Sequence, residues 1–98
     1  MKPHHFYNMN TAIKSNLRSA HTCKIGKVFE TRRLLLALSE IEVASINHIN
    51  LNYIQAIEAG DYSVFPARIF AIQYFRKFAN FLNLKVDFFD IYNKINSW

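Results

Sequence analysis

The chain has 98 residues, which suffices for one domain with a modest core but not for two. Apolar residues make up 51% of it, and Gly and Pro number only two each. Apolar positions recur at spacings of three and four, so the composition favours an all-α fold over a β-sheet. The formal net charge of +5 suits an anionic partner such as nucleic acid or lipid headgroups, and equally suits plain solubility.

Several kinds of protein and site are disfavoured by what the sequence lacks. It has no run of about 20 uncharged apolar residues and no apolar signal-peptide region at its start, so we expect a cytoplasmic protein. One cysteine, Cys23, excludes an internal disulfide. The histidines at 4, 5, 21 and 48 match no compact metal motif with Cys23, and a Cys23–His21 pair would lack an orienting third group. Without a glycine-rich phosphate loop either, we predict no enzyme, metal or cofactor.

The first part of the chain differs in composition from the rest. Residues 1–24 are rich in Asn, Thr, Ser and His, and no acid precedes Glu30. We therefore predict that residues 1–24 form a basic and mostly mobile tail. The domain itself is predicted over residues 25–95, and residues 96–98 form its C-terminal end.

The next segment carries the signals of a helix-turn-helix unit. A first helix is expected from Ile25, with Ile25, Phe29, Leu36 and the aliphatic stem of Arg33 on its buried face. Ser39 is a suitable cap for a second helix, whose early acids favour the positive end of the helix dipole. Its predicted buried contacts are Ile41, Val43 and Ala44. A short turn over residues 47–49 then leads to a third helix capped by Asn50, and two short helices so joined form a helix-turn-helix.

Two more helices are expected to complete a five-helix bundle. Gly60 stands where the third helix must end in a left-handed conformation. Pro66 is a good first residue for a fourth helix, because its missing N–H costs nothing in the first turn. That helix is expected to reach about Leu82, where Asn83 is the next-best left-handed residue. A fifth helix over residues 86–95 is expected to close the bundle with Phe88, Phe89, Ile91 and Tyr92.

The third helix provides one candidate function, DNA recognition. The second helix of a helix-turn-helix usually enters the major groove, where Asn and Gln can pair with adenine. The candidate DNA-binding residues are Asn47, His48, Asn50, Asn52 and Gln55. The helix carries no Lys or Arg and ends in Glu58, so it lacks the phosphate attraction that supplies most nonspecific affinity. A basic tail could supply part of that attraction, and solvated polar residues of a protein-binding module remain the alternative.

The fourth helix provides the other candidate function, protein binding. At 100° per residue, one apolar stripe is core: Ala71, Phe75, Phe78, Ala79 and Leu82. A second stripe holds Phe70, Tyr74 and Phe81, with Lys77 among them. Either the fifth helix and the tail cover this stripe, or it is exposed as a row of aromatic anchors of the kind that dominate protein interfaces.

The order and spacing of these signals over roughly residues 25–95 resemble the cytoplasmic domain of the bacterial cell-shape protein family RodZ. The matching residues are Ile25, Gly26, Phe29 and Arg33; Leu38, Ser39, Val43 and Ala44; Ile49, Tyr53, Ile54, Ala56, Ile57, Glu58, Gly60, Asp61, Tyr62 and Pro66; and Phe75, Arg76, Phe78, Ala79, Leu82 and Leu84. The resemblance implies a Cro/C1-type helix-turn-helix fold. It also implies the cytoplasmic side of an inner membrane, because RodZ proteins continue through a basic linker into a transmembrane helix.

The resemblance also implies a partner. In RodZ, this domain docks onto the actin-like filament protein MreB, with aromatic residues of the fourth helix central to the contact. Phe70 and Tyr74 occupy the matching positions, and Lys77 and Arg68 would meet acidic groups at the rim. No catalysis is implied. A third interpretation, that neither surface functions, is disfavoured because nearly all core positions remain apolar.

The chain departs from the family pattern at several positions. Ala37 replaces a glycine, and Ile72 and Gln73 replace a basic residue and a glycine. Residues 34–36, all leucine, stand where polar or charged residues are usual, and Leu34 and Leu35 suggest an additional contact such as a dimer.

Overall fold

The computed structural model describes residues 17–95 and is all-α, which confirms the predicted class. Its elements are α2 (Ala20–Leu35), α3 (Glu40–Asn47), α4 (Leu51–Ala59), the 3-10 turn η1 (Tyr62–Val64), α5 (Arg68–Phe81) and α6 (Ile91–Ile95). The five α-helices correspond in order to the five that were predicted. None of these helices is long and apolar enough to cross a membrane.

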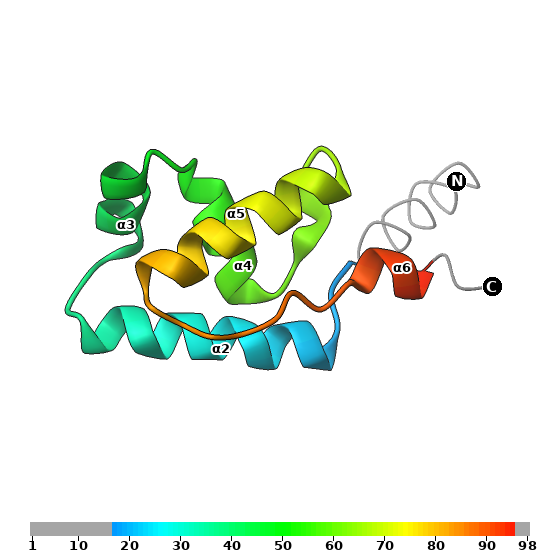
Figure 1. The fold of residues 1–98 in the computed structure, drawn as a ribbon, viewed down its shortest axis with the longest axis horizontal. Helices are drawn as coiled ribbons and strands as arrows, with labels where there is room; N and C mark the ends of the chain where they lie inside the picture. Colours follow the sequence, from blue (N-terminus) through cyan, green and yellow to red (C-terminus); the bar gives the residue numbers. More distant parts are fainter. Residues whose placement is uncertain (1–16, 96–98) are drawn as a thin grey trace, which may run out of the picture.

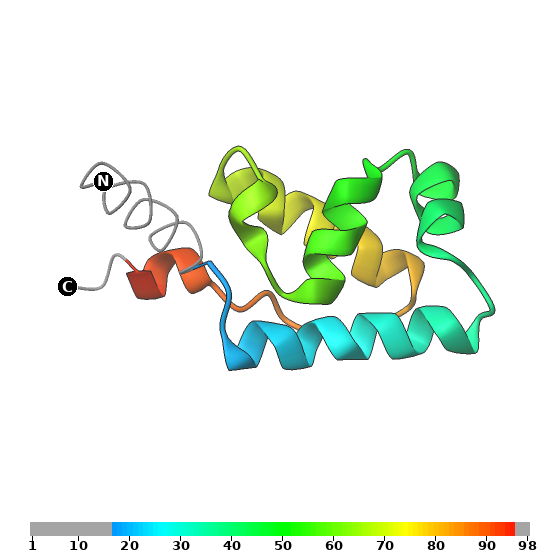
Figure 2. The same cartoon turned by 180° about the vertical axis from the view of Figure 1, so that it is seen from behind.

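The other helices lie on one side of α2, which runs along one long edge of the molecule (Figures 1 and 2). The helix-turn-helix pair α3–α4 and α5 lie above it. After α5, an extended segment returns alongside α2 to α6, which lies near the start of α2 (Figure 1). Arg32 of α2 ties the start of this segment to α2, because its guanidinium donates to the Leu82 carbonyl at 2.8 Å.

The first helix begins earlier than expected. It starts at Ala20 rather than at Ile25, so residues 20–24, which were assigned to the tail, form its first turns. The reason is a capping box, in which Ser19 accepts from the Thr22 N–H and the Thr22 hydroxyl accepts from the Ser19 N–H. The Thr22 hydroxyl also donates to the Gly60 carbonyl at 2.7 Å. Residues 1–16 of the mobile tail predicted over residues 1–24, and the predicted end at residues 96–98, lie outside the described residues.

Aromatic side chains of α2 and α5 pack together within a core to which every helix contributes. Phe29 lies 5.0 Å from Phe75 and 4.9 Å from Phe78 between ring centroids. The buried apolar set is Phe29, Val43, Ala44, Ile49, Ile54, Ala56, Ile57, Tyr62, Phe65, Ala71, Phe75, Phe78, Ala79, Leu82 and Ile91. Two predicted core residues are wrong: Leu36 is 49% and Ile41 67% exposed. Leu36 follows the last turn of α2 and Ile41 lies in the first turn of α3, where neither faces the core.

Within residues 17–95, four residues with a left-handed backbone end helices or turns: Ala37, His48, Gly60 and Asn83. Gly60 has φ 73°, as predicted for the end of α4, and Asn83 has φ 56°, as predicted after α5. Ala37, in the loop between α2 and α3, has φ 58°. Because a Cβ disfavours this conformation, the glycine that the RodZ pattern has here is the unstrained choice.

The last two helices are shorter than predicted. α5 begins at Arg68 rather than at Pro66, after Ala67 in an extended conformation. The predicted helix over residues 86–95 is helical only from Ile91. Residues 86–90 have no regular secondary structure, and Phe88 among them packs edge-on against Phe75, at 5.4 Å between centroids. Asp90 then accepts from the Asn93 N–H at 3.2 Å in the first turn of α6.

Candidate functional site

Local capping builds the helix-turn-helix. Ser39 accepts from the Glu42 N–H at 3.0 Å and Glu42 accepts from the Ser39 N–H at 2.8 Å, a capping box that starts α3. His48 ends α3 in a left-handed conformation, with φ 55°. Asn50 then starts α4 by accepting from the Asn52 N–H at 2.8 Å. These caps fix where α3 ends and α4 begins, and so set the turn between the two helices.

The five predicted DNA-binding residues divide into two groups. Asn47 is half-buried and its amide donates to the Val43 carbonyl at 2.9 Å, and Asn50 is occupied as the cap of α4. His48, Asn52 and Gln55 are exposed. Three side chains thus remain available for an outside partner.

The structure has a buried ion pair between α2 and α4, which the sequence analysis did not predict. Arg33 of α2 donates to both carboxylate oxygens of Glu58, at 2.6 and 2.9 Å, and to the Leu38 carbonyl at 2.8 Å. The side chains are only 9% and 6% exposed. The pairing raises the pKa of Arg33, while burial raises that of Glu58 against the opposing effect of Arg33. Glu58 lies four residues after buried Ile54, a spacing that could have indicated its inward direction.

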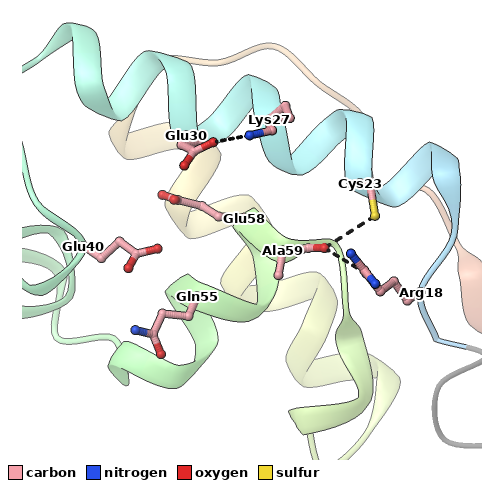
Figure 3. Close-up of a pocket in the computed structure, with 8 residues that line it drawn as sticks. All are labelled: Arg18, Cys23, Lys27, Glu30, Glu40, Gln55, Glu58 and Ala59. Carbon is pink, nitrogen blue, oxygen red and sulfur yellow. Dashed lines mark hydrogen bonds and ion pairs between the residues drawn. The ribbon is translucent and has the colours of Figure 1, made fainter.

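A shallow crevice between α2 and α4 collects charged side chains without forming a catalytic arrangement (Figure 3). It measures about 380 Å³ and is lined by Arg18, Cys23, Lys27, Glu30, Glu40, Gln55, Glu58 and Ala59. The Cys23 thiol donates to the Ala59 carbonyl at 3.6 Å, whereas the His21 ring lies 4.4 Å from Phe89, so the two side chains face different elements. Among residues 17–95, no group of three His, Cys, Asp or Glu side chains could hold a metal ion.

The predicted partner surface on α5 is partly open. Phe70 is 39% exposed and Lys77 is exposed. Tyr74 is half-buried against Tyr53 of α4, at 5.0 Å between centroids, and Phe81 is half-buried against the core. Helix α4 therefore covers Tyr74 in part, whereas the elements predicted to cover this stripe were the fifth helix and the tail.

Further side chains extend this α5 surface. Arg68 pairs with Asp90 at 2.8 Å, and the same pair lowers the pKa of Asp90. Next to Phe70, Ile69 is 62% exposed. It begins a shallow groove of about 440 Å³ lined by Ile69, Ile72, Gln73, Arg76, Lys77 and Asn80. Arg76 and Lys77 make no ion pair within the described part of the chain. The face thus combines exposed apolar side chains with free cations.

Comparison with known proteins bears on this geometry. A family model described as a helix-turn-helix domain matches residues 29–88, which run from the middle of α2 to the extended segment before α6. No curated protein and no solved structure matches the chain.

Proposed function

Because this chain belongs to the family of helix-turn-helix domains, we propose that it is a binding module without catalytic activity that docks onto a protein through α5. By its resemblance to RodZ, we further propose that the partner is an actin-like MreB filament and that the protein works in the cytoplasm. The observation that carries the proposal is the exposed aromatic and aliphatic pair Phe70 and Ile69 beside the free cation Lys77.

The energetics of such a surface favour protein binding. A partly exposed aromatic ring gains by full burial, and interface energy usually concentrates in a few such anchors. Lys77 and Arg76 would lie at the edge, where they steer an acidic partner more than they add affinity. Arg68 is already paired with Asp90, so we assign it a supporting role in shaping the start of α5.

The charge of the helix-turn-helix also favours protein binding over DNA binding. Helices α3 and α4 contain Glu40 and Glu42, besides Glu58 that Arg33 neutralises, and they contain no Lys or Arg. Glu42 is exposed in the first turn of α3. A DNA phosphate would be repelled there rather than attracted.

Cosedimentation with MreB filaments tests the proposal. Phe70→Ala should weaken binding by about 1–3 kcal/mol, roughly five- to 150-fold, because it removes the exposed anchor while the core stays intact. Ile46→Ala is the matched control, since Ile46 is a 56% exposed apolar residue on α3, away from α5. Equal pelleting of both variants and the unaltered chain would refute docking through Phe70.

DNA binding is the second candidate, and one observation favours it. The charge of Glu58 is buried against Arg33, so this acid does not face a major groove that Asn52 and Gln55 could enter. A duplex-binding assay tests it, because affinity carried by phosphate contacts falls steeply with salt. Loss of that affinity in Gln55→Ala, with no effect of Phe70→Ala, would favour this second function.

A further inference from the structure

The shallow groove on α5 differs in chemistry between its two ends. It follows the helix, and the apolar pair Ile69 and Ile72 lies near its start. Arg76 and Lys77 lie one to two helical turns later. Figure 1 shows α5 in front of α4, with no other described helix crossing it. The groove is therefore open, apolar at one end and basic at the other.

No acidic residue of α5 neutralises the basic end. The helix contains Arg68, Arg76 and Lys77 and no Asp or Glu. Arg68 pairs with Asp90, whereas Arg76 and Lys77 are exposed and form no ion pair with any residue in the described part of the chain. Complementarity requires carboxylates on the partner at this end and apolar side chains at the other end. The apolar end disfavours a nucleic acid, whose outer surface is lined by phosphates.

The fold also indicates which kind of protein segment fits the groove. Within residues 17–95 there is no strand, so an extended segment finds no sheet edge on which to pair its backbone. The contact must therefore come from side chains, which an amphipathic helix supplies at spacings of three, four and seven residues. From Ile69 to Asn80 the groove extends about 16 Å, or about three turns of a helix.

We propose that the partner segment seated on α5 is an amphipathic helix that runs antiparallel to α5, with acidic residues in its first turn and apolar residues in its later turns. This inference rests on the proposed docking through α5. The acidic turn lies beside Arg76 and Lys77, and the apolar turns lie on Ile69, Phe70 and Ile72. The antiparallel direction brings the positive N-terminal end of the partner helix towards the negative C-terminal end of α5. Acidic residues are themselves favoured in the first turn of a helix.

Charge reversal tests the acidity of the partner helix. Arg76→Glu combined with Lys77→Glu should weaken cosedimentation with MreB filaments at least about ten-fold at low salt, and added salt should narrow the difference. Lys24→Glu combined with Lys27→Glu is the matched control, because it makes the same change of charge at exposed positions of α2. This control should bind the filament like the unaltered chain. Circular dichroism verifies the fold of both double variants.

The variant Phe70→Ala separates this inference from the docking proposal. If Phe70→Ala weakens pelleting but the reversal on α5 has no more effect than the reversal on α2, docking through α5 stands and the acidic helix is wrong. If the unaltered chain does not pellet, or if Phe70→Ala pellets equally well, the docking proposal fails and this inference fails with it.

Photo-cross-linking tests the direction of the partner helix. A photoreactive benzoylphenylalanine replaces Ile69 in one variant and the exposed Asn80 in another, and mass spectrometry identifies the filament residues that each captures. The residue at position 80 should capture the acidic first turn of a helix, and the residue at position 69 a later turn of the same helix. Capture in the opposite order would overturn the antiparallel direction, and capture of a strand or a loop would overturn the helix.

Discussion

At Gly26 the backbones of α2 and α4 lie too close together to leave room for a Cβ, so Gly26→Ala should destabilise the fold, the reverse of the usual effect of such a substitution. An added Cβ would lie 2.2 Å from the Glu58 carbonyl oxygen and 2.7 Å from that of Ile57. Both contacts are to backbone, which cannot swing aside as a side chain could. The two helices would have to separate and so loosen the Arg33–Glu58 pair, which ties the same helices together.

Two opposing effects set the magnitude. In an exposed helix, Gly→Ala gains about 1 kcal/mol of helix propensity. Overpacking a tight site costs about 1–3 kcal/mol, and a clash with rigid backbone belongs at or beyond the upper end of that range. We therefore expect Gly26→Ala to lower the free energy of unfolding by about 2 kcal/mol.

Urea unfolding followed by circular dichroism measures this change. Asn80→Ala is a matched control, because Asn80 is an exposed position in the last turn of α5 and the change should stabilise by a few tenths of a kcal/mol at most. A Gly26→Ala protein as stable as the unaltered chain, or more stable, would refute the close approach of α2 and α4.

Three further predictions concern stability. Ala37→Gly should raise the free energy of unfolding by about 0.5–1 kcal/mol in urea titrations, because it relieves a left-handed alanine, and a loss would contradict the loop conformation. Arg33→Met should cost about 3 kcal/mol by stranding buried Glu58, and adding Glu58→Leu should recover most of it; equal stability of single and double variants would argue against the pair. Burial and the charge of Asp90 raise the pKa of Tyr92 to about 12 in the folded chain, against about 10 in the unfolded chain. The stabilisation of the fold by neutral Tyr92 is therefore complete below about pH 10 and is lost as pH rises towards about 12. Between about pH 9 and pH 11, urea unfolding should show a smaller fall in the free energy of unfolding for Tyr92→Phe than for the unaltered chain. An equal fall in the two proteins would contradict the raised pKa of Tyr92.

Much of the fold could be predicted because its signals are local. Ser39, Asn50 and Gly60 each act on hydrogen bonds within a few residues, and all three cap the helices that were predicted for them. Asn83 ends α5 for the same reason. The start of α2 was missed although its signal is also local: Ser19 and Thr22 form a capping box in which threonine takes the place of the usual Glu or Gln.

The parts that could not be predicted depend on residues far apart in the chain. Arg33 and Glu58 are 25 positions apart, and only the packing of α4 on α2 brings them together. The exposure of the aromatic stripe on α5 likewise depends on packing between residues that are far apart in the chain. Periodicity puts Tyr74 and Phe70 on one face, but Tyr53 from α4 covers Tyr74 in part and leaves Phe70 more open.

The measurement that tests the central claim most directly is a paired titration of the full chain against MreB filaments and against duplex DNA, with Phe70→Ala and Gln55→Ala as variants. Docking through α5 predicts that the unaltered chain binds the filament, that Phe70→Ala binds it about five-fold or more weakly, and that Gln55→Ala matches the unaltered chain. Affinity for DNA alone, reduced by Gln55→Ala and untouched by Phe70→Ala, would contradict the account.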